Sequence, residues 1–309
     1  MDKKILLAVD GSIHSTNAVT YAVRMATVVS DLTYTLFHVQ PTLSQYLLDE
    51  AETDLKARAE LKKIIQKNTE LAQRVLEKHK ARMVRMGIKE ERIETSTQIK
   101  IMGICKDILD GAQKGLFDAI VVGRRGLSRI QETLMGSITT KLVEHSRVIP
   151  LWIVDGDVTS MKLLLAVDGS EASLRAVDHL CFMVGGNEEA KATLVHVKPK
   201  FRDYCAIDFD DKEGAAGEVM ARGEKRCIDR FYAQALDKFK EVGLSETQIE
   251  ISVTKPTMDV AKAIVTQAKK GKYGTIVVGR TGTSNAFFMG SVSRHILNKI
   301  SDSAAWLVP

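Results

Sequence analysis

The stretch ILLAVDGS, residues Ile5–Ser12, decides the fold, because it returns almost unchanged as LLLAVDGS at Leu163–Ser170. An apolar run that ends in Asp-Gly-Ser is typical of a buried strand followed by a turn. The two copies begin 158 residues apart in a chain of 309 residues. A strand and turn repeated at about half the chain length predict that a whole domain is repeated.

Three further pairs of segments return in the same order. They are AIVVGRRG (119–126) with TIVVGRTG (275–282), MGSITTKL (135–142) with MGSVSRHI (289–296), and LWIV (151–154) with AWLV (305–308). Their offsets of 156, 154 and 154 residues show that the spacing is kept along the chain. We therefore expect two domains, residues 1–155 and 159–309, joined by the polar linker Asp155–Ser160.

Each copy alternates short apolar segments with amphipathic ones, which predicts strands and helices in turn. The expected strands are Lys4–Val9, Tyr34–Val39, Ile93–Ile99, Asp118–Gly123 and Pro150–Val154, and in the second copy Lys162–Val167, Ala192–Val197, Gln248–Val253, Thr275–Val278 and Ala305–Val308. The fold class is α/β: two repeated doubly wound domains, each a five-stranded parallel sheet with helices on both faces. A 3-2-1-4-5 strand order, which alternation alone does not establish, would bring the first and fourth strand ends to one crevice.

The expected helices have recognisable ends. In the first copy they cover Ser15–Val29, a long segment Gln45–Met86 with a break left open, Ile104–Lys114, and a helix that begins at Gly136. Ser12 or Ser15 is the expected N-cap of the first helix, and Gly87 follows the end of the long one. The long charged helices, Gln45–Met86 and roughly Gly217–Val242, are expected to cover the sheet, with a partner surface as the alternative.

Composition excludes several classes of protein. The net charge is +5, and Lys and Arg stand beside Asp and Glu, which is typical of solvated helix faces and not of nucleic-acid binding. The four cysteines, Cys105, Cys181, Cys205 and Cys227, form no CxxC pair or metal-ligand spacing, so we expect neither a metal site nor disulfides. No apolar run approaches the roughly 18 residues of a membrane span, and the charged start is unlike a signal peptide. These features predict a cytoplasmic protein.

A glycine constellation follows the fourth strand of the first copy. Gly123 and Gly126 end this strand, and Gly136 with Ser137 opens the next helix. Glycines allow close backbone approach and positive φ, and a helix start offers unpaired N–H groups to a phosphate. Arg125 would supply positive charge. The alternative is that each glycine serves only the packing of a strand-to-helix turn.

Asp10 and Asp168 end their first strands, and each precedes Gly-Ser. Such a carboxylate can accept hydrogen bonds from a nucleoside, or it can form an Asx turn or N-cap for the next helix. His38 and His196 recur in the second strands, which suggests a role in strand packing. The chain has no GxxxxGK[ST] motif, and no catalytic triad or acid–base pair can be placed. We therefore expect no catalytic residues and, at most, slow and incidental ATP hydrolysis.

The segments LLAVDGS and AIVVGRRG, with the spacing G-x2-G-x9-G-S, resemble the universal stress protein family over essentially the whole chain. The resemblance implies binding of ATP, with AMP or ADP as alternatives, and leaves open whether Mg²⁺ accompanies the phosphates. The residues that it implies for the first site are Ala8, Val9, Asp10, Val39, Val122, Gly123, Arg125, Gly126, Gly136, Ser137 and Ile138. Asp10 would hold the nucleoside, the backbone of Val39 would contact adenine, and the glycines with Ser137 would hold the phosphates.

A second site is implied at matching positions, with two departures from the motif. Its residues are Ala166, Val167, Asp168, Val197, Gly279, Gly282, Gly290, Ser291 and Val292. Only seven residues, Thr283–Met289, separate Gly282 from Gly290, where the first copy has nine, and Thr281 stands where the first copy has Arg125. The first site therefore matches the family pattern better.

The family resemblance also implies an assembly. Leu151–Val154 and Ala305–Val308 would pair as last strands and form an internal pseudo-dimer, which would cover edge strands that otherwise expose backbone N–H and C=O groups. A homodimer is left open. The leading hypothesis is a cytoplasmic ATP-binding regulatory protein of the stress response, without nucleic-acid or membrane partners. The alternatives are an interaction scaffold that binds no nucleotide, above all in the second domain, and an adenylating enzyme, which DGSIHS (10–15) does not support.

Overall fold

The computed structural model describes residues 2–126, 135–198, 215–254, 257–282 and 289–309. The chain divides into two compact units, one made of Met1–Arg24 and Asp31–Asp157, the other of Met25–Ser30 and Val158–Pro309. The loop expected to differ between the copies, Thr283–Met289, and the residue Cys205 lie largely or wholly outside the described residues. Within the described residues, no helix is long and apolar enough to cross a membrane.

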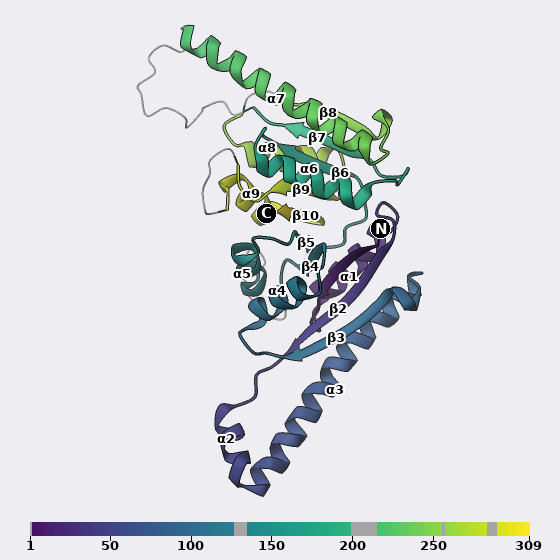
Figure 1. Cartoon of the computed structure of the whole chain (residues 1–309), viewed down its shortest axis with the longest axis vertical. Helices are drawn as coiled ribbons and strands as arrows, with labels where there is room; N and C mark the ends of the chain where they lie inside the picture. Colours follow the sequence, from purple (N-terminus) through teal and green to yellow (C-terminus); the bar gives the residue numbers. More distant parts are fainter. Residues whose placement is uncertain (1, 127–134, 199–214, 255–256, 283–288) are drawn as a thin grey trace. The chain divides into compact units, whose positions relative to one another are not determined.

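The first unit is built on a parallel sheet of five strands (Figure 1). The strands are β1 (Lys3–Ala8), β2 (Leu32–Gln40), β3 (Ile93–Ile99), β4 (Ala119–Gly123) and β5 (Leu151–Asp155). β1 pairs with β2 and β4, β2 also pairs with β3, and β4 also pairs with β5, all in parallel. The order is 3-2-1-4-5, as expected.

The second unit repeats this plan. Its strands are β6 (Leu163–Val167), β7 (Ala192–His196), β8 (Ile249–Val253), β9 (Thr275–Gly279) and β10 (Ser303–Val308). β6 pairs with β7 and β9, β7 also pairs with β8, and β9 also pairs with β10, again in parallel. The residues of β9 are all buried, and those of β10 nearly so, which explains their continuous apolar sequence.

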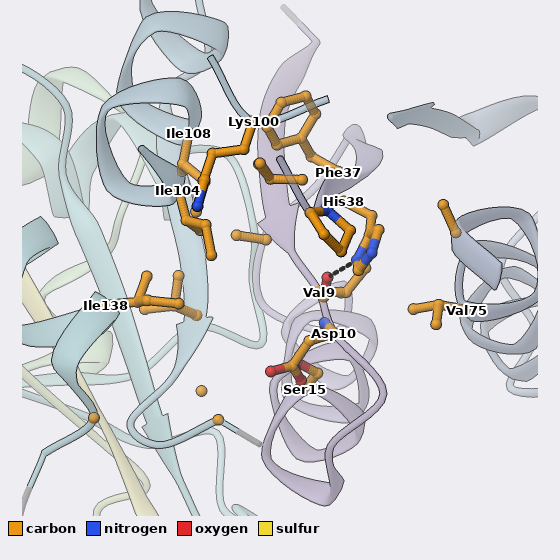
Figure 2. Close-up of a pocket in the computed structure, with 18 of the residues that line it drawn as sticks. Val9, Asp10, Ser15, Phe37, His38, Val75, Lys100, Ile104, Ile108 and Ile138 are labelled. Carbon is orange, nitrogen blue, oxygen red and sulfur yellow. Dashed lines mark hydrogen bonds between the residues drawn. The ribbon is translucent and has the colours of Figure 1, made fainter. Parts of the chain in front are cut away.

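Helices connect the strands in each unit. They are α1 (Ile13–Met25), α2 (Gln45–Thr53), α3 (Leu55–Arg85), α4 (Ile104–Lys114) and α5 (Ser137–His145), then α6 (Glu171–Val184), α7 (Ala215–Glu241), α8 (Val260–Lys270) and α9 (Ser291–Lys299). Short 3₁₀ turns, η1 (Glu90–Arg92) and η2 (Glu246–Gln248), precede β3 and β8. In the first unit, α3 and α4 lie on opposite faces of the sheet, as right-handed crossovers require (Figure 2).

The helix ends follow the sequence closely. Ser12, and not Ser15, caps α1, because the Ser15 backbone N–H donates to Ser12 Oγ at 3.1 Å. The long segment breaks at Asp54, whose carboxylate accepts from the Lys56 N–H and caps α3. Gly87 has a φ of 99° after the end of α3, a conformation that favours glycine.

One expectation about the linker is wrong. The sequence places Asp155 in the polar segment Asp155–Ser160, yet this residue is the last of β5 and is buried. A buried carboxylate needs a partner, and both Arg124 and Arg125 supply one, at 3.4 and 2.8 Å. Val158 is also buried, so only part of this segment has the character of a polar linker.

Candidate functional site

A cavity of about 710 Å³ opens in the first unit where β1, β2 and β4 end. Every residue expected at the first site lines it: Ala8, Val9, Asp10, Val39, Val122, Gly123, Arg125, Gly126, Gly136, Ser137 and Ile138. Their meeting follows from the strand order, because β1 lies between β2 and β4. The carboxyl ends of these parallel strands then share one edge of the sheet.

Asp10 is held in place by its own turn. Its Oδ1 accepts from the Ser12 N–H at 2.9 Å and from the Ser15 hydroxyl at 2.7 Å, while its N–H donates to Ser15 Oγ. The Asx turn is therefore present, but it engages one carboxylate oxygen. The other, Oδ2, faces Gly126, where an added Cβ would lie 3.0 Å from it. Asp10 thus combines a turn with a carboxylate edge at the cavity.

The three glycines serve different purposes. A Cβ at Gly123 would lie 2.8 Å from the backbone C and O of His14, so this glycine is required for close packing of β4 against α1. Gly126 admits the Asp10 carboxylate, and a Cβ at Gly136 would lie 3.3 Å from Arg125 Cα. None of the three has a positive φ, so close backbone approach, and not the positive φ that glycine also allows, explains these glycines.

The opening of α5 supplies donors at the cavity. Gly136 is the N-cap, with φ −61° and ψ 149° and no side-chain cap hydrogen bond. Ser137, Ile138 and Thr139 line the cavity and form the first turn, where backbone N–H groups have no intrahelical partner. The Thr139 hydroxyl donates to Gly123 O at 2.9 Å and ties this turn to the end of β4.

The second copy builds the same frame around less space. Asp168 Oδ1 accepts from the Ser170 N–H and the Ser173 hydroxyl, and a Cβ at Gly282 would lie 3.0 Å from Asp168 Oδ2. Its cavity has a volume of about 220 Å³. All expected residues of the second site line it: Ala166, Val167, Asp168, Val197, Gly279, Gly282, Gly290, Ser291 and Val292.

Comparison with known proteins decides the family. The model of the universal stress protein family matches residues 1–155 and matches again at residues 160–303. The chain belongs to the universal stress protein family. Its two repeats are therefore two universal stress protein domains in tandem, with the glycine segments at the positions described above.

Individual relatives are distant. A universal stress protein of Mycolicibacterium smegmatis is 26% identical over 180 residues, which cover 57% of this chain and 57% of the relative. The chain thus matches little more than half the length of that relative. A universal stress protein from Archaeoglobus fulgidus DSM 4304 aligns with a TM-score of 0.58 at 18% identity, over 99% of this chain and 95% of that one. A structure from Pseudomonas aeruginosa UCBPP-PA14, described as a candidate member, has a TM-score of 0.55 at 17% identity, over 99% and 93%. At these identities the structures show the shared fold.

Arg125 is not the free cation at the cavity that its place between the motif glycines suggests, because it forms an ion pair. It lines the cavity, but its guanidinium donates to Asp155 Oδ1 at 2.8 Å. Asp155 is buried and also lies 3.4 Å from Arg124, so the Arg125 guanidinium is held at a carboxylate that two arginines share. The second domain has Thr281 at the position of Arg125.

Several cavity residues of this universal stress protein domain lie outside its motif. They are Ser15, Phe37, His38, Pro41, Thr42, Asn68, Leu71, Ala72, Val75, Lys100, Ile104, Ile108 and Thr139. Some of them had a sequence signal: Ser15 recurs as Ser173, His38 recurs as His196, and Thr139 corresponds to Ser293. The residues of α3 follow helical spacing, but spacing alone does not say whether a helix faces a sheet or a cavity.

His38 and His79 make hydrogen bonds with the backbone carbonyl groups of Val9 and Asp10. His38 Nδ1 lies 2.8 Å from Val9 O, so Nδ1 carries a proton and donates to this carbonyl oxygen. His196 makes the matching contact with Val167 O at 3.0 Å, which agrees with the expected packing role. His79 of α3 contacts Asp10 O through Nε2 at 3.1 Å, and burial lowers the pKa of His79. A neutral imidazole thereby joins α3 to the end of β1.

Proposed function

We propose that the first repeat binds an adenine nucleotide, ATP in the first place, with AMP and ADP as alternatives. The observation that carries the proposal is that Asp10 and the opening of α5 line one cavity. A carboxylate accepts hydrogen bonds from nucleoside groups, and helix N–H groups with a positive dipole end favour phosphate. A volume of about 710 Å³ is also within the usual range for small-molecule sites.

The residues of the first site fit such a ligand. Gly126 and Gly136 leave room beside the Asp10 carboxylate and the start of α5, which a Cβ would reduce. Apolar side chains from both faces of the sheet, among them Val75 and Ile104, line the rest and suit the faces of a purine ring (Figure 2). Ser137 adds a hydroxyl at the phosphate end. A Mg²⁺ ion would be held mainly by the phosphates themselves.

We propose a regulatory role for the nucleotide, without catalysis. Among the described residues of the cavity, the titratable side chains are Asp10, His38, Lys100 and Arg125. Asp10 Oδ1 is engaged in its turn, His38 is bonded to the backbone, and Arg125 is paired. This set supports binding better than activation of a water, so we expect any hydrolysis to be slow and incidental.

Calorimetric titration of the whole chain with ATP tests the proposal. We expect Gly136→Val and Asp10→Ala to weaken binding by at least about 100-fold, and Asp10→Asn, which keeps a side-chain oxygen, to weaken it less. The matched variants Gly290→Val and Asp168→Ala should leave the first site within about twofold of the wild type. Unchanged affinity in both first-site variants, folded by circular dichroism, would contradict the proposal.

The second repeat is proposed as an interaction scaffold that holds no nucleotide. Its cavity of about 220 Å³ is below the usual range for a ligand of this size. Mass spectrometry of the chain purified without added nucleotide gives the measurement, since we expect at most one adenine nucleotide per chain. Two bound nucleotides per chain would contradict the scaffold role.

A cytoplasmic place in the stress response completes the proposed function. The described cysteines Cys105, Cys181 and Cys227 are free thiols, which suits a reducing compartment. Cell fractionation during stress would test this. The pairing of Leu151–Val154 with Ala305–Val308 and the domain limits 1–155 and 159–309 stay predictions, and light scattering of the purified chain would test the open question of a homodimer.

A further inference from the structure

Lys100 stands on a rigid turn at the edge of the first cavity. Its N–H donates to Gln40 O at 3.0 Å, which anchors it beside the end of β2. The next three N–H groups, of Ile101, Met102 and Gly103, donate to the carboxylate of Asp107 at 3.0, 3.0 and 3.3 Å. Asp107 is 1% exposed, so this carboxylate is a fixed part of the structure. The root of the Lys100 side chain is therefore pre-positioned before any ligand binds.

The Lys100 side chain extends into the cavity along the apolar side chains of Ile104 and Ile108 (Figure 2). In that view its ammonium lies on the same side of the cavity as Ile138, in the first turn of α5, while Asp10 and His38 lie on the other. Among the described residues, no hydrogen bond or ion pair reaches the Lys100 ammonium. Lys100 is half-buried as a residue, and its stem lies on an apolar wall, so the ammonium can reach a ligand in the cavity.

We propose that Lys100, and not Arg125, is the cation that holds a phosphate group of the nucleotide bound in the first repeat. The inference rests on the proposed function and adds the residue that sets the preference for phosphorylated ligands. Arg125 is held by an ion pair with Asp155, whereas Lys100 has no such partner in the described part of the chain. A flexible ammonium acts on phosphate as a point charge and would complement the N–H groups at the start of α5.

The second repeat has other residues at the matching positions of its sequence. The equivalent histidines His38 and His196 pair with Thr97 of β3 and Val253 of β8. Lys100 is three residues after Thr97, and the residue three after Val253 in the sequence is Pro256. The position of Asp107, three residues into α4, is matched by Ala263 on α8. At these positions of the sequence, the second repeat therefore has neither the lysine nor the aspartate of the first.

Titration of the full chain with ATP, AMP and adenosine tests the role of Lys100. We expect Lys100→Met and Lys100→Gln to weaken ATP binding by about 10- to 100-fold, and adenosine binding by no more than about twofold. Lys100→Arg should keep part of the ATP affinity. The matched control is Lys106→Met, which removes the same charge from an exposed position of α4. This control should stay within about twofold of wild type for all three ligands.

The outcomes separate the inference from the proposed function. An equal loss for adenosine and ATP would place the ammonium at the nucleoside and overturn the phosphate assignment. Wild-type ATP affinity in both folded Lys100 variants would also overturn it, while the proposed function would stand. If the wild-type chain binds neither ATP nor adenosine, the proposed function itself fails and the inference with it.

Discussion

The two repeats share a frame but differ in the space inside it. In both, an Asp after the first strand accepts from a Ser N–H and a Ser hydroxyl, and a glycine faces its second oxygen. Yet the cavity measures about 710 Å³ in the first repeat and about 220 Å³ in the second. The motif therefore specifies the strand-end geometry, and residues outside the motif decide how much room a ligand has.

The helix that follows the second strand accounts for part of this difference. The same backbone hydrogen bond follows both helices: Ile88 N–H donates to Met83 O after α3, and Leu244 N–H donates to Phe239 O after α7. If these two bonds are taken as equivalent, each residue of α3 corresponds to the residue of α7 that is 156 positions later. At this register Ala72 and Val75, which line the first cavity, correspond to Ile228 and Phe231. Both larger side chains are buried, and neither lines the second cavity.

The largest expected effect comes from transferring these residues. Ala72→Ile with Val75→Phe should fill the first cavity and weaken ATP binding by at least about 100-fold, or about 3 kcal/mol, measured by calorimetry. Val75→Phe alone, at a half-buried position, is the milder variant if the pair overpacks the core. The matched pair Ile228→Ala with Phe231→Val should leave ATP binding unchanged. Wild-type affinity in a folded double variant would show that α3 does not limit the site.

Gly123 provides a test of what the repeats have in common. Gly123→Ala should lower the free energy of unfolding by about 2–3 kcal/mol, because its Cβ would lie 2.8 Å from the His14 backbone. Gly279→Ala should act alike, since its Cβ would lie 2.7 Å from the Ala172 backbone. Gly11→Ala is the control, with nothing within 4 Å of its Cβ. Urea unfolding measures all three, and a Gly123→Ala protein as stable as the control would refute this packing role.

The parallel sheet and the position of Asp10, Gly126 and Gly136 after strand ends could be predicted from the sequence pattern. The 3-2-1-4-5 order, which brings these residues to one edge, did not follow from the pattern and is confirmed by the structure. Apolar runs separated by helices require parallel strands, and repeated Gly and Asp at strand ends then share an edge. The individual purpose of each glycine could not be predicted. Packing against His14 at Gly123, for example, depends on the distance between α1 and β4, which no local pattern encodes.

Long-range contacts explain the other failures of sequence reasoning. Asp155 has the composition of a linker, and only its contacts with Arg124 and Arg125, about 30 residues away, make it part of the core. A lysine after a strand is ordinary, so no sequence pattern distinguishes Lys100. Its position at the cavity depends on Asp107, which accepts three backbone N–H groups only in the folded turn.

His179 is expected to make the second repeat sensitive to acid at a position where the first repeat has a tyrosine. It takes the place of Tyr21, and each packs edge-on against the tryptophan of the last strand, His179 on Trp306 and Tyr21 on Trp152. Burial lowers the pKa of His179 from 6.5 to about 3. The unfolded chain therefore binds a proton below pH 6.5 that the folded chain refuses, so stability is unaffected above that pH and falls as the pH drops towards 3.

His179→Tyr, which copies the first repeat, should remove this dependence. At pH 5 we expect the loss of stability relative to pH 7 to be smaller in the variant than in wild type by roughly 2 kcal/mol. Urea unfolding at pH 5 and pH 7 measures the loss of stability in each protein. Comparing this loss between variant and wild type removes the contribution of the other histidines, which both proteins share. His179→Phe serves as a second variant without a hydroxyl. Equal pH dependence in wild type and variants would show that His179 is protonated without cost.

The smallest expected effect concerns two side-chain contacts, one in each repeat, that join α3 to α1 and α7 to α6. These contacts support the alignment of α3 with α7 on which the comparison of the two cavities depends. Lys238 of α7 lies 2.6 Å from Asp178 of α6, and Arg82 Nε of α3 donates to Thr20 Oγ1 of α1 at 3.0 Å. Arg82 corresponds to Lys238 at an offset of 156 residues, and Thr20 corresponds to Asp178 at an offset of 158, so the two contacts occupy equivalent positions. Lys238→Met should cost about 0.5 kcal/mol at low salt, because both side chains of the pair are part-exposed, and almost nothing at 1 M NaCl. Arg82→Met should cost about 1 kcal/mol at either salt concentration, since its hydroxyl partner is neutral. The two variants should therefore differ in how their loss of unfolding free energy depends on salt. The same salt dependence in both would contradict the assignment of an ion pair to Lys238 and of a hydrogen bond with a neutral partner to Arg82.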